Sequence, residues 1–272
     1  MPELPEVETL AVQLARALEG RKISEVEIRN DSLLKTPRIE LQDEIVGKQI
    51  VQVGRRGKYI RMDLSRDLSL WFHLGMTGQL FLEHPPSPPK SHTHFILSFL
   101  DSSDRLFYRD IRRFGRIALT STAGDAFPEG VKRLGREPQE WNLREWVLFF
   151  KERRARIKSL LLNQRVVAGL GNIYADESLH RAGIHPLRRA SQVSREKLER
   201  LHEVIREILD EAIRFGGSSI DDFIHVDGGR GRFQEFHRVY GRVGRECFRC
   251  GAVIRTVKVS GRTSSFCPRC QH

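Results

Sequence analysis

The chain has 272 residues, with 46 Lys and Arg against 35 Asp and Glu, a net charge of +11 and 39% hydrophobic residues. This length and composition predict about two folded domains and exclude a chain that is disordered throughout. No run approaches eighteen apolar residues, and residues 1–6 are acidic where a signal peptide is basic and then apolar, so we expect a soluble, cytoplasmic protein with no membrane contact. The positive charge indicates nucleic acid as the partner, with a solvated basic surface as the alternative.

The N-terminal half combines one helix with a series of strands. An amphipathic helix is predicted over 6–19, because four apolar residues stand at helical spacing: Val7, Leu10, Leu14 and Leu18. Gly20 is expected to end it. From 22 to about 121 the apolar period is two, which predicts a sandwich or barrel of seven to eight short strands. Within it, the Pro-rich segment 84–91 predicts an extended hairpin loop.

The second half is helical. Helices are predicted over 143–162, 171–181 and 194–215, the last with Ser194 as its N-cap and Gly216-Gly217 as its end. Pro and Gly interrupt both patterns within 126–142, where we place a domain boundary. The fold class is therefore α+β and multidomain. We divide the chain into an N-terminal domain, 1–130, a helical domain, 131–224, and a C-terminal segment, 225–272, with a zinc finger at 238–272.

All four cysteines lie in the last 26 residues, as two C-x2-C pairs: Cys247, Cys250, Cys267 and Cys270. Such pairs can close a tetrahedral thiolate shell around one Zn²⁺. Disulfides are the alternative, but nothing indicates secretion. A shell of four thiolates leaves no position for water, so we expect a structural zinc that folds a segment too short for its own core. Strands at 253–259 and 264–266 around a turn at 260–263 predict a zinc ribbon hairpin with Arg262 near its tip.

Positive charge is concentrated in the same segment. Residues 225–272 hold ten Lys and Arg, Lys258 and Arg262 among them, against three acids, which accounts for seven of the eleven net positive charges. This local excess favours a surface that contacts phosphates over an evenly solvated one.

The N-terminus offers a nucleophile. Removal of the initiator Met leaves Pro2 with a secondary amine, which can form an iminium with an aldose carbon, and N-terminal amines in peptides have a pKa of about 7.7 to 8.0. Glu3 and Glu6 lie beside it as proton donors or acceptors. From these residues alone, an ordinary helix start with Pro and acids in its first turn is the alternative.

Five motifs and the four-cysteine ribbon occur in a specific order: PELPEVET at 2–9, GKY at 57–59, HLGMTG at 73–78, RRFG at 112–115 and GLGNIY at 169–174. Together they closely resemble bacterial formamidopyrimidine-DNA glycosylases over essentially the whole chain. The resemblance implies an N-terminal helix on a β-sandwich, then a helix–two-turns–helix domain with a C-terminal zinc ribbon. It also implies a base-excision repair enzyme, expected to be monomeric, that binds double-stranded DNA containing an oxidised purine or abasic site. Such an enzyme excises 8-oxoguanine and formamidopyrimidines and then nicks the strand as an AP lyase.

The same resemblance implies catalytic roles for five residues. Pro2 becomes the nucleophile that attacks C1′ and forms a Schiff base, and Glu3 the proton donor in base release. Glu6 matches a nearby acid, with helix support as its alternative role. Lys58 matches the proton donor of β-elimination and a phosphate contact, and Arg262 the donor of δ-elimination, whose guanidinium can grip flanking phosphates.

A lesion inside a duplex cannot reach the amine, so the base must be flipped out. Met76, Arg112 and Phe114 match the residues that fill the resulting void. Phe114 wedges the base step, Met76 takes the vacated space, and Arg112 faces the orphaned base. Core packing is the alternative for the two apolar residues, but Phe114 is embedded among cations, which favours an exposed wedge.

Asn172, at the start of a helix that follows a glycine turn, is expected to bind one DNA phosphate. The remaining expected DNA contacts are His73, His92, Arg153, Lys158 and Lys258. The glycine-rich segment 216–232 matches the loop that closes over the everted base, a mobile lid.

Two other identities stay open. One is the sister family endonuclease VIII, against which Leu4, Phe114 and the Gly-Gly-Ser-Ser sequence of the lid argue. The other is a non-catalytic zinc-ribbon DNA-binding protein.

Overall fold

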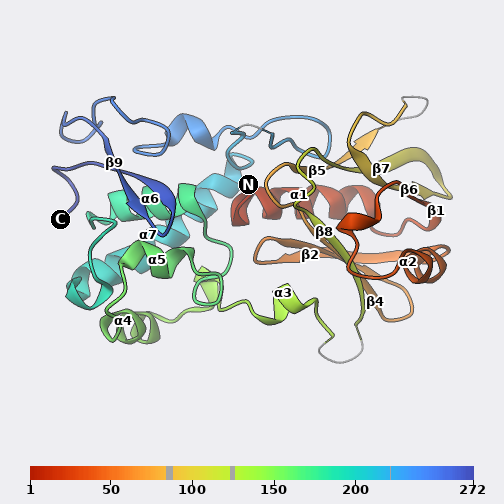
Figure 1. Cartoon of the computed structure of the whole chain (residues 1–272), viewed down its shortest axis with the longest axis horizontal. Helices are drawn as coiled ribbons and strands as arrows, with labels where there is room; N and C mark the ends of the chain where they lie inside the picture. The colour runs from red at the N-terminus through yellow and green to blue at the C-terminus, as the bar shows by residue number, and fades with distance from the viewer. Residues whose placement is uncertain (84–87, 123–125, 221) are drawn as a thin grey trace. The chain divides into compact units, whose positions relative to one another are not determined.

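The computed structural model describes residues 1–83, 88–122, 126–220 and 222–272 (Figure 1). The chain forms two compact units, Met1–Lys132 with Phe215–Arg232, and Arg133–Arg214 with Phe233–His272. The first four residues of the hairpin loop predicted over 84–91 lie outside the described residues. Within the described ranges, no helix is long and apolar enough to cross a membrane.

The first unit contains α1 (Leu4–Leu18) and two antiparallel four-stranded sheets. One sheet has the order β1-β6-β7-β5, from β1 (Ile23–Ile28), β6 (Thr93–Phe99), β7 (Ser102–Asp110) and β5 (Gly78–Glu83). The other has the order β2-β3-β4-β8, from β2 (Ile50–Arg56), β3 (Tyr59–Leu64), β4 (Leu68–His73) and β8 (Arg116–Ser121). A 3-10 turn (Asp31–Leu33), α2 (Arg38–Ile45) and α3 (Glu129–Lys132) complete the unit. These strands confirm the predicted sandwich.

The N-terminal helix packs one face on the core that the two sheets share (Figure 1). The four apolar residues of its predicted stripe are buried in one core with side chains of both sheets. The helix begins at Leu4, two residues earlier than predicted, because Glu3 and Glu6 form a capping box in which the Glu3 N–H donates to Glu6 Oε2 at 2.8 Å. The sequence did not predict α2, which buries only Leu41 and Ile45 and therefore has little periodicity.

The second unit contains α4 (Leu143–Lys151), α5 (Ile157–Leu162), α6 (Asn172–Arg181) and α7 (Arg195–Arg214), with 3-10 turns at Pro138–Glu140, Ala190–Gln192 and Phe233–Phe236. The prediction of one helix over 143–162 is wrong. The chain leaves the helical path at 152–156, where the Ala190 N–H donates to Ala155 O and the Ile157 N–H to Arg188 O. Pairing with the segment before α7 replaces helical hydrogen bonds there. Ser194 Oγ accepts the Lys197 N–H at 3.3 Å, as its predicted N-cap role requires.

The C-terminal hairpin consists of β9 (Arg255–Val259) and β10 (Arg262–Phe266). Its turn is shorter than predicted and contains only Ser260 and Gly261, both with positive φ, as a type I′ hairpin requires. Arg262 therefore opens β10, paired with Val259, instead of lying within the turn. Helix α6 holds this hairpin, since Asp176 accepts hydrogen bonds from Ser264 Oγ at 2.6 Å and from the Ser265 N–H at 2.8 Å.

Candidate active site and nucleic-acid interface

The N-terminal residues lie at the start of α1. Met1 is exposed, whereas Pro2 is buried and Glu3 and Glu6 are 3% and 1% exposed. The capping box described above holds the Glu6 carboxylate against the Glu3 backbone, and Glu3 follows Pro2 in the chain. With Met1 attached, the Pro2 nitrogen is a tertiary amide, which is not a nucleophile. The predicted nucleophile and both acids therefore belong to one helix start, and an amine arises there only when Met1 is removed.

Lys58 and His73 lie close to each other in the sheet that contains β2, β3 and β4, Lys58 in a turn and His73 at the end of a strand. Lys58 is 5% exposed in the two-residue turn between β2 and β3, and the next residue, Tyr59, pairs with His73 on β4, with ring centroids 4.6 Å apart. Burial first, and then the charges of Lys58 and Arg116, lower the pKa of His73 to about 4. His73 Nδ1 accepts the Gly75 N–H at 3.3 Å. The neutral ring therefore carries its hydrogen on Nε2 and can donate one hydrogen bond at neutral pH.

The three expected void-filling residues form one exposed cluster. Met76 is 43% and Phe114 48% exposed. Arg112 contacts both, with Nη1 3.3 Å from Met76 Sδ and Cζ 4.7 Å from the Phe114 ring centroid. Side chains this exposed do not belong to the core, so the core-packing alternative is wrong for both apolar residues.

A buried acid that sequence reasoning missed holds this cluster in place. Asp110 is 0% exposed and accepts hydrogen bonds from Thr77 Oγ1 at 2.5 Å, the Arg112 N–H at 3.2 Å and the Gly115 N–H at 2.8 Å. It therefore ties the loop after β4 to the loop after β7. Gly75 is required at the same place, because its φ is +62° and a Cβ would lie 2.7 Å from the Phe114 carbonyl carbon. The only signal for Asp110 in the sequence is its position two residues before Arg112.

The other expected DNA contacts are exposed or partly exposed, with one exception. His92 is exposed just before β6 and accepts the Asp110 N–H on its carbonyl at 3.0 Å. The Arg153 guanidinium stacks on the Phe149 ring of the same unit, with Cζ 3.4 Å from the ring centroid. Lys258 is exposed on β9 and Arg262 on β10.

Lys158 is the exception, because its side chain is 0% exposed. Its ammonium lies 2.6 Å from Asp176 Oδ1 and donates to Asn172 Oδ1 at 2.7 Å. Burial raises the pKa of Asp176, and the positive charge of Lys158 opposes that shift. Asn172 Nδ2 in turn donates to the Thr263 carbonyl of the hairpin at 2.9 Å. The complete burial of the Lys158 side chain argues against the expected direct contact with DNA, and Asn172 links its ammonium to the hairpin.

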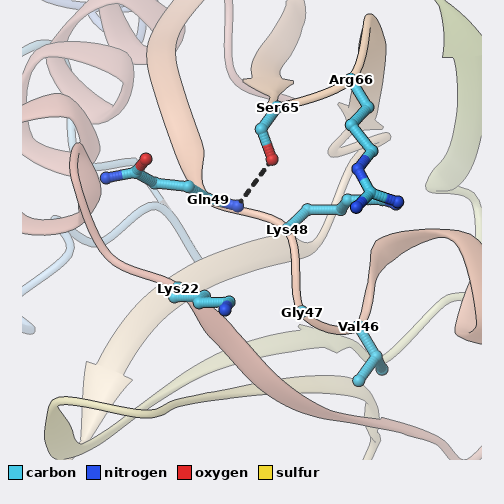
Figure 2. Close-up of a pocket in the computed structure, with 7 residues that line it drawn as sticks. All are labelled: Lys22, Val46, Gly47, Lys48, Gln49, Ser65 and Arg66. Carbon is cyan, nitrogen blue, oxygen red and sulfur yellow. Dashed lines mark hydrogen bonds between the residues drawn. The ribbon is translucent and has the colours of Figure 1, made fainter.

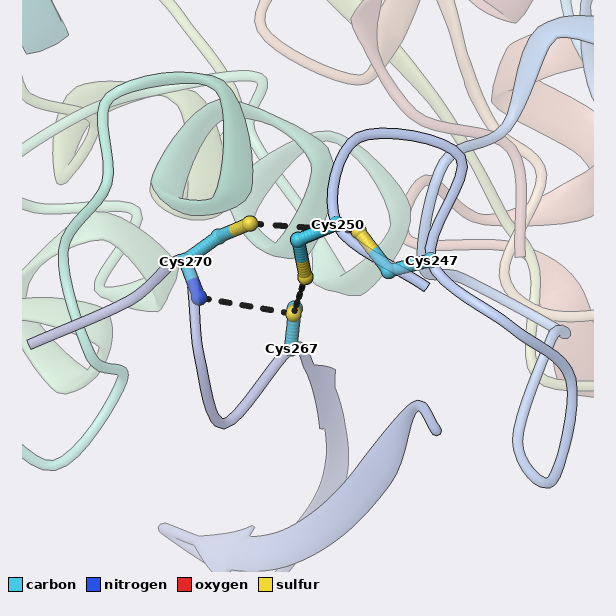
Figure 3. A group of neighbouring side chains, drawn as sticks. All are labelled: Cys247, Cys250, Cys267 and Cys270. Carbon is cyan, nitrogen blue, oxygen red and sulfur yellow. Dashed lines mark hydrogen bonds between the residues drawn. The ribbon is translucent and has the colours of Figure 1, made fainter. Parts of the chain in front are cut away.

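The four cysteines face a common centre (Figure 3). Their Sγ atoms all lie within 4.8 Å of one another, with 3.9 Å between Cys247 and Cys270 and 3.4 Å between Cys250 and Cys267. Sulfur atoms about 3.8 Å apart are what a tetrahedral zinc site with Zn–S bonds of about 2.3 Å requires. All four cysteines are free, so the disulfide alternative is wrong. A hydrogen bond from the Ala252 backbone is the main cause that lowers the pKa of Cys250 to about 7. Four thiol donors arranged in this way fit one zinc ion.

Three family models match consecutive parts of the chain. They are the formamidopyrimidine-DNA glycosylase N-terminal domain over 1–117, the formamidopyrimidine-DNA glycosylase H2TH domain over 134–224, and the zinc finger found in FPG and IleRS over 244–272. Among curated proteins, the formamidopyrimidine-DNA glycosylases of Pelotomaculum thermopropionicum and Solibacter usitatus are 45% and 44% identical, over 100% of this chain and 99% of theirs. The chain belongs to the formamidopyrimidine-DNA glycosylase family.

Solved structures of this family agree with the fold. The complex of Lactococcus lactis Fpg with abasic-site DNA has a TM-score of 0.92 at 38% identity and covers 99% of both chains. The complex of MutM with carbocyclic 8-oxo-G DNA has a TM-score of 0.92 at 39% identity and covers 100% of both. The α+β fold with a helix–two-turns–helix domain is thereby confirmed. The zinc-finger match and the geometry of the cysteines confirm one structural zinc in the ribbon.

One group of cations lies away from Pro2, the predicted nucleophile. Figure 2 shows a pocket of about 500 Å³ with Lys22, Lys48 and Arg66 in its lining, between the end of α1, the end of α2 and the turn after β3. Pro2 precedes the other end of α1, so a 15-residue helix of about 22 Å separates the two places. The pocket is therefore no part of the candidate active site. It adds positive charge outside the C-terminal segment, where the sequence located most of it.

Proposed function

We propose that this chain excises oxidised purines, 8-oxoguanine and formamidopyrimidines, from double-stranded DNA and then cleaves the strand as an AP lyase. One observation carries the proposal: Pro2 precedes α1 with the buried acids Glu3 and Glu6 beside it, in a chain 45% identical over its length to a formamidopyrimidine-DNA glycosylase. The DNA named with the similar solved structures, which contains an abasic site, Fapy-dG or 8-oxo-G, supports the same substrate class. Its site of action is then the DNA of the bacterial cytoplasm.

The chemistry begins with removal of Met1, which converts the Pro2 nitrogen into a secondary amine. The amine attacks C1′ of the flipped nucleotide, the bond from C1′ to the base breaks, and the base leaves with its electron pair. Glu3 supplies the proton that base release requires. The Pro2 nitrogen then loses its proton, the C1′–O4′ bond breaks with O4′ taking up a proton, and an iminium forms between Pro2 and C1′, which makes the C2′ hydrogens acidic.

Strand cleavage follows from the iminium. Loss of a C2′ proton expels the 3′ phosphate by β-elimination, and a second elimination expels the 5′ phosphate. We assign the proton transfer of the first step to Lys58 and that of the second to Arg262. The neutral His73 ring carries its hydrogen on Nε2 and donates it in a hydrogen bond to a DNA phosphate.

DNA binding uses residues of both units. Phe114, Met76 and Arg112 enter the duplex where the base leaves, which their exposure supports. The phosphates are bound by His92 from the first unit, and by four residues of the second unit: Asn172, Arg153, Lys258 and Arg262. Segment 216–232 covers the everted base. We assign these roles to an N-terminal domain (1–130), a helix–two-turns–helix domain (131–224) and a C-terminal segment (225–272).

Borohydride trapping tests this function directly, because borohydride reduces the iminium to a stable amine. The Met1-free protein is mixed with duplexes that contain 8-oxoguanine opposite cytosine, or thymine glycol. We expect a covalent complex with 8-oxoguanine that disappears when the N-terminus is blocked. Trapping only with thymine glycol would indicate the endonuclease VIII activity, and no adduct with either lesion would refute the enzyme in favour of a DNA-binding protein.

A further inference from the structure

The described part of segment 215–232, which we call the lid, is closed at its base and anchored to the rest of the first unit. At its base the Arg232 N–H donates to the Phe215 carbonyl at 2.9 Å. Further along, the Val226 carbonyl accepts the Leu82 N–H of β5 at 2.9 Å, and the Val226 side chain is buried in the core of the sandwich. The lid is therefore a packed loop with defined anchors.

Glu6 makes a further anchor, at the start of α1. Its Oε1 accepts the Ser218 N–H at 2.7 Å, while its Oε2 accepts the Glu3 N–H at 2.8 Å. The two oxygens of one buried carboxylate thus bind two backbone groups, one in the lid and one next to Pro2. In both contacts the carboxylate is the acceptor and a backbone N–H is the donor.

The glycines before Ser218 are shaped for this contact. Gly216 and Gly217 have φ values of +72° and +79°, a conformation that glycine adopts without strain. A Cβ at Gly217 would lie 2.9 Å from both Cγ and Oε1 of Glu6. Only a residue without a side chain allows the lid backbone to approach Glu6 this closely.

We propose that Glu6 is a positioning residue. It holds the lid against the Pro2–Glu3 segment and so fixes the position of the covered base relative to the attacking nitrogen. This inference rests on the proposed function. The positioning role of Glu6 affects base excision but not strand cleavage at an abasic site, because an abasic site has no base for the lid to hold. Loss of the contact between Glu6 and Ser218 should slow base excision and leave strand cleavage at a preformed abasic site unchanged.

The test substitution is Glu6→Gln. A Gln side chain has one acceptor oxygen, and the Glu3 N–H is fixed at the helix start, so the oxygen stays with Glu3 and the amide group faces the Ser218 N–H. We expect single-turnover excision of 8-oxoguanine opposite cytosine to slow by about 100-fold, the size of effect that a misplacement of about 1 Å produces. Cleavage of a duplex with a preformed abasic site should stay within about threefold of the unsubstituted protein.

Two further variants make the result decisive. Glu8→Gln changes the next acid of α1, whose carboxylate binds Arg55 and not the lid, and should show no difference between the two reactions. Gly217→Ala separates the lid from Glu6 while keeping the Glu6 carboxylate in the chain, and it should reproduce the selective loss of excision. Equal loss of both reactions, or loss of neither, in Glu6→Gln and Gly217→Ala would overturn the positioning role. If the unsubstituted protein excises nothing, the proposed function itself fails, and this is seen before any variant is compared.

Discussion

The buried ion pair of the second unit leads to a quantitative prediction. Lys158 and Asp176 have side chains that are 0% exposed, with 2.6 Å between Nζ and Oδ1. Lys158→Met keeps an unbranched chain in the same space but leaves the Asp176 carboxylate without its countercharge. Breaking a buried pair from one side costs about 3–5 kcal/mol, so we expect a large loss in the free energy of unfolding of this unit.

The pH dependence follows from the proton that Asp176 must then take up. Burial raises the pKa of Asp176, and in the variant the charge of Lys158 no longer opposes that shift, so folding favours the protonated acid over the unfolded carboxyl, whose pKa is about 3.9. Binding that proton costs up to about 4 kcal/mol at pH 7 and about 1.5 kcal/mol at pH 5. Because the folded pKa is raised, the variant is weakest at high pH, and its deficit shrinks as the pH falls towards 3.9.

Urea unfolding measured by tryptophan fluorescence, at pH 7 and pH 5, tests this prediction. A Trp71→Phe background leaves Trp141 and Trp146, both in the second unit, as the only reporters. Lys151→Met is the matched control, since Lys151 is exposed and its ammonium donates only to the Val193 carbonyl among the described contacts. We expect the control to cost less than about 1 kcal/mol. A loss below about 1 kcal/mol for Lys158→Met at pH 7, or an equal loss at both pH values, would refute the reasoning.

Three other predictions concern the zinc, the wedge and the buried histidine. Chelation of the zinc should unfold the ribbon, because its own core is little more than Val239, Ile254 and the cysteines. DNA binding should weaken while the β-sheet circular dichroism signal persists. Equal loss of binding and of this signal would contradict a separately folded ribbon. Phe114→Ala should change the free energy of unfolding by less than about 1 kcal/mol, because the ring is half exposed, yet slow excision of 8-oxoguanine; an unchanged excision rate would exclude the wedge role. Between pH 7.5 and pH 5 the protein should lose about 2 kcal/mol through His73, because the unfolded imidazole, with a pKa of about 6.5, binds a proton that the folded one, with a pKa of about 4, does not. His73→Asn, whose Oδ1 can still accept the Gly75 N–H, should lack this part of the slope, and an unchanged slope in urea unfolding would show that His73 is not its source.

The sequence alone determined the features that depend on residues close together in the chain. The spacing of the apolar residues in α1 decides which face of that helix is buried, and two C-x2-C pairs decide the zinc ligands, because both are set by local geometry. The order of short motifs was specific enough to indicate the family and, with it, the candidate site residues. The same local reasoning failed at 152–156, where the backbone makes hydrogen bonds with the segment before α7 in place of helical hydrogen bonds.

Only the tertiary structure decided which distant residues meet and how deeply each is buried. In the sequence Lys158 is one more cation, and nothing near it in the chain shows that Asp176 and Asn172 enclose its ammonium. Glu6 and the lid residue Ser218 are 212 positions apart, yet they share a hydrogen bond beside the predicted nucleophile. Burial and hydrogen-bond partners determine the charge state of a polar side chain and which groups it can contact. Both depend on packing between segments that are far apart in the sequence.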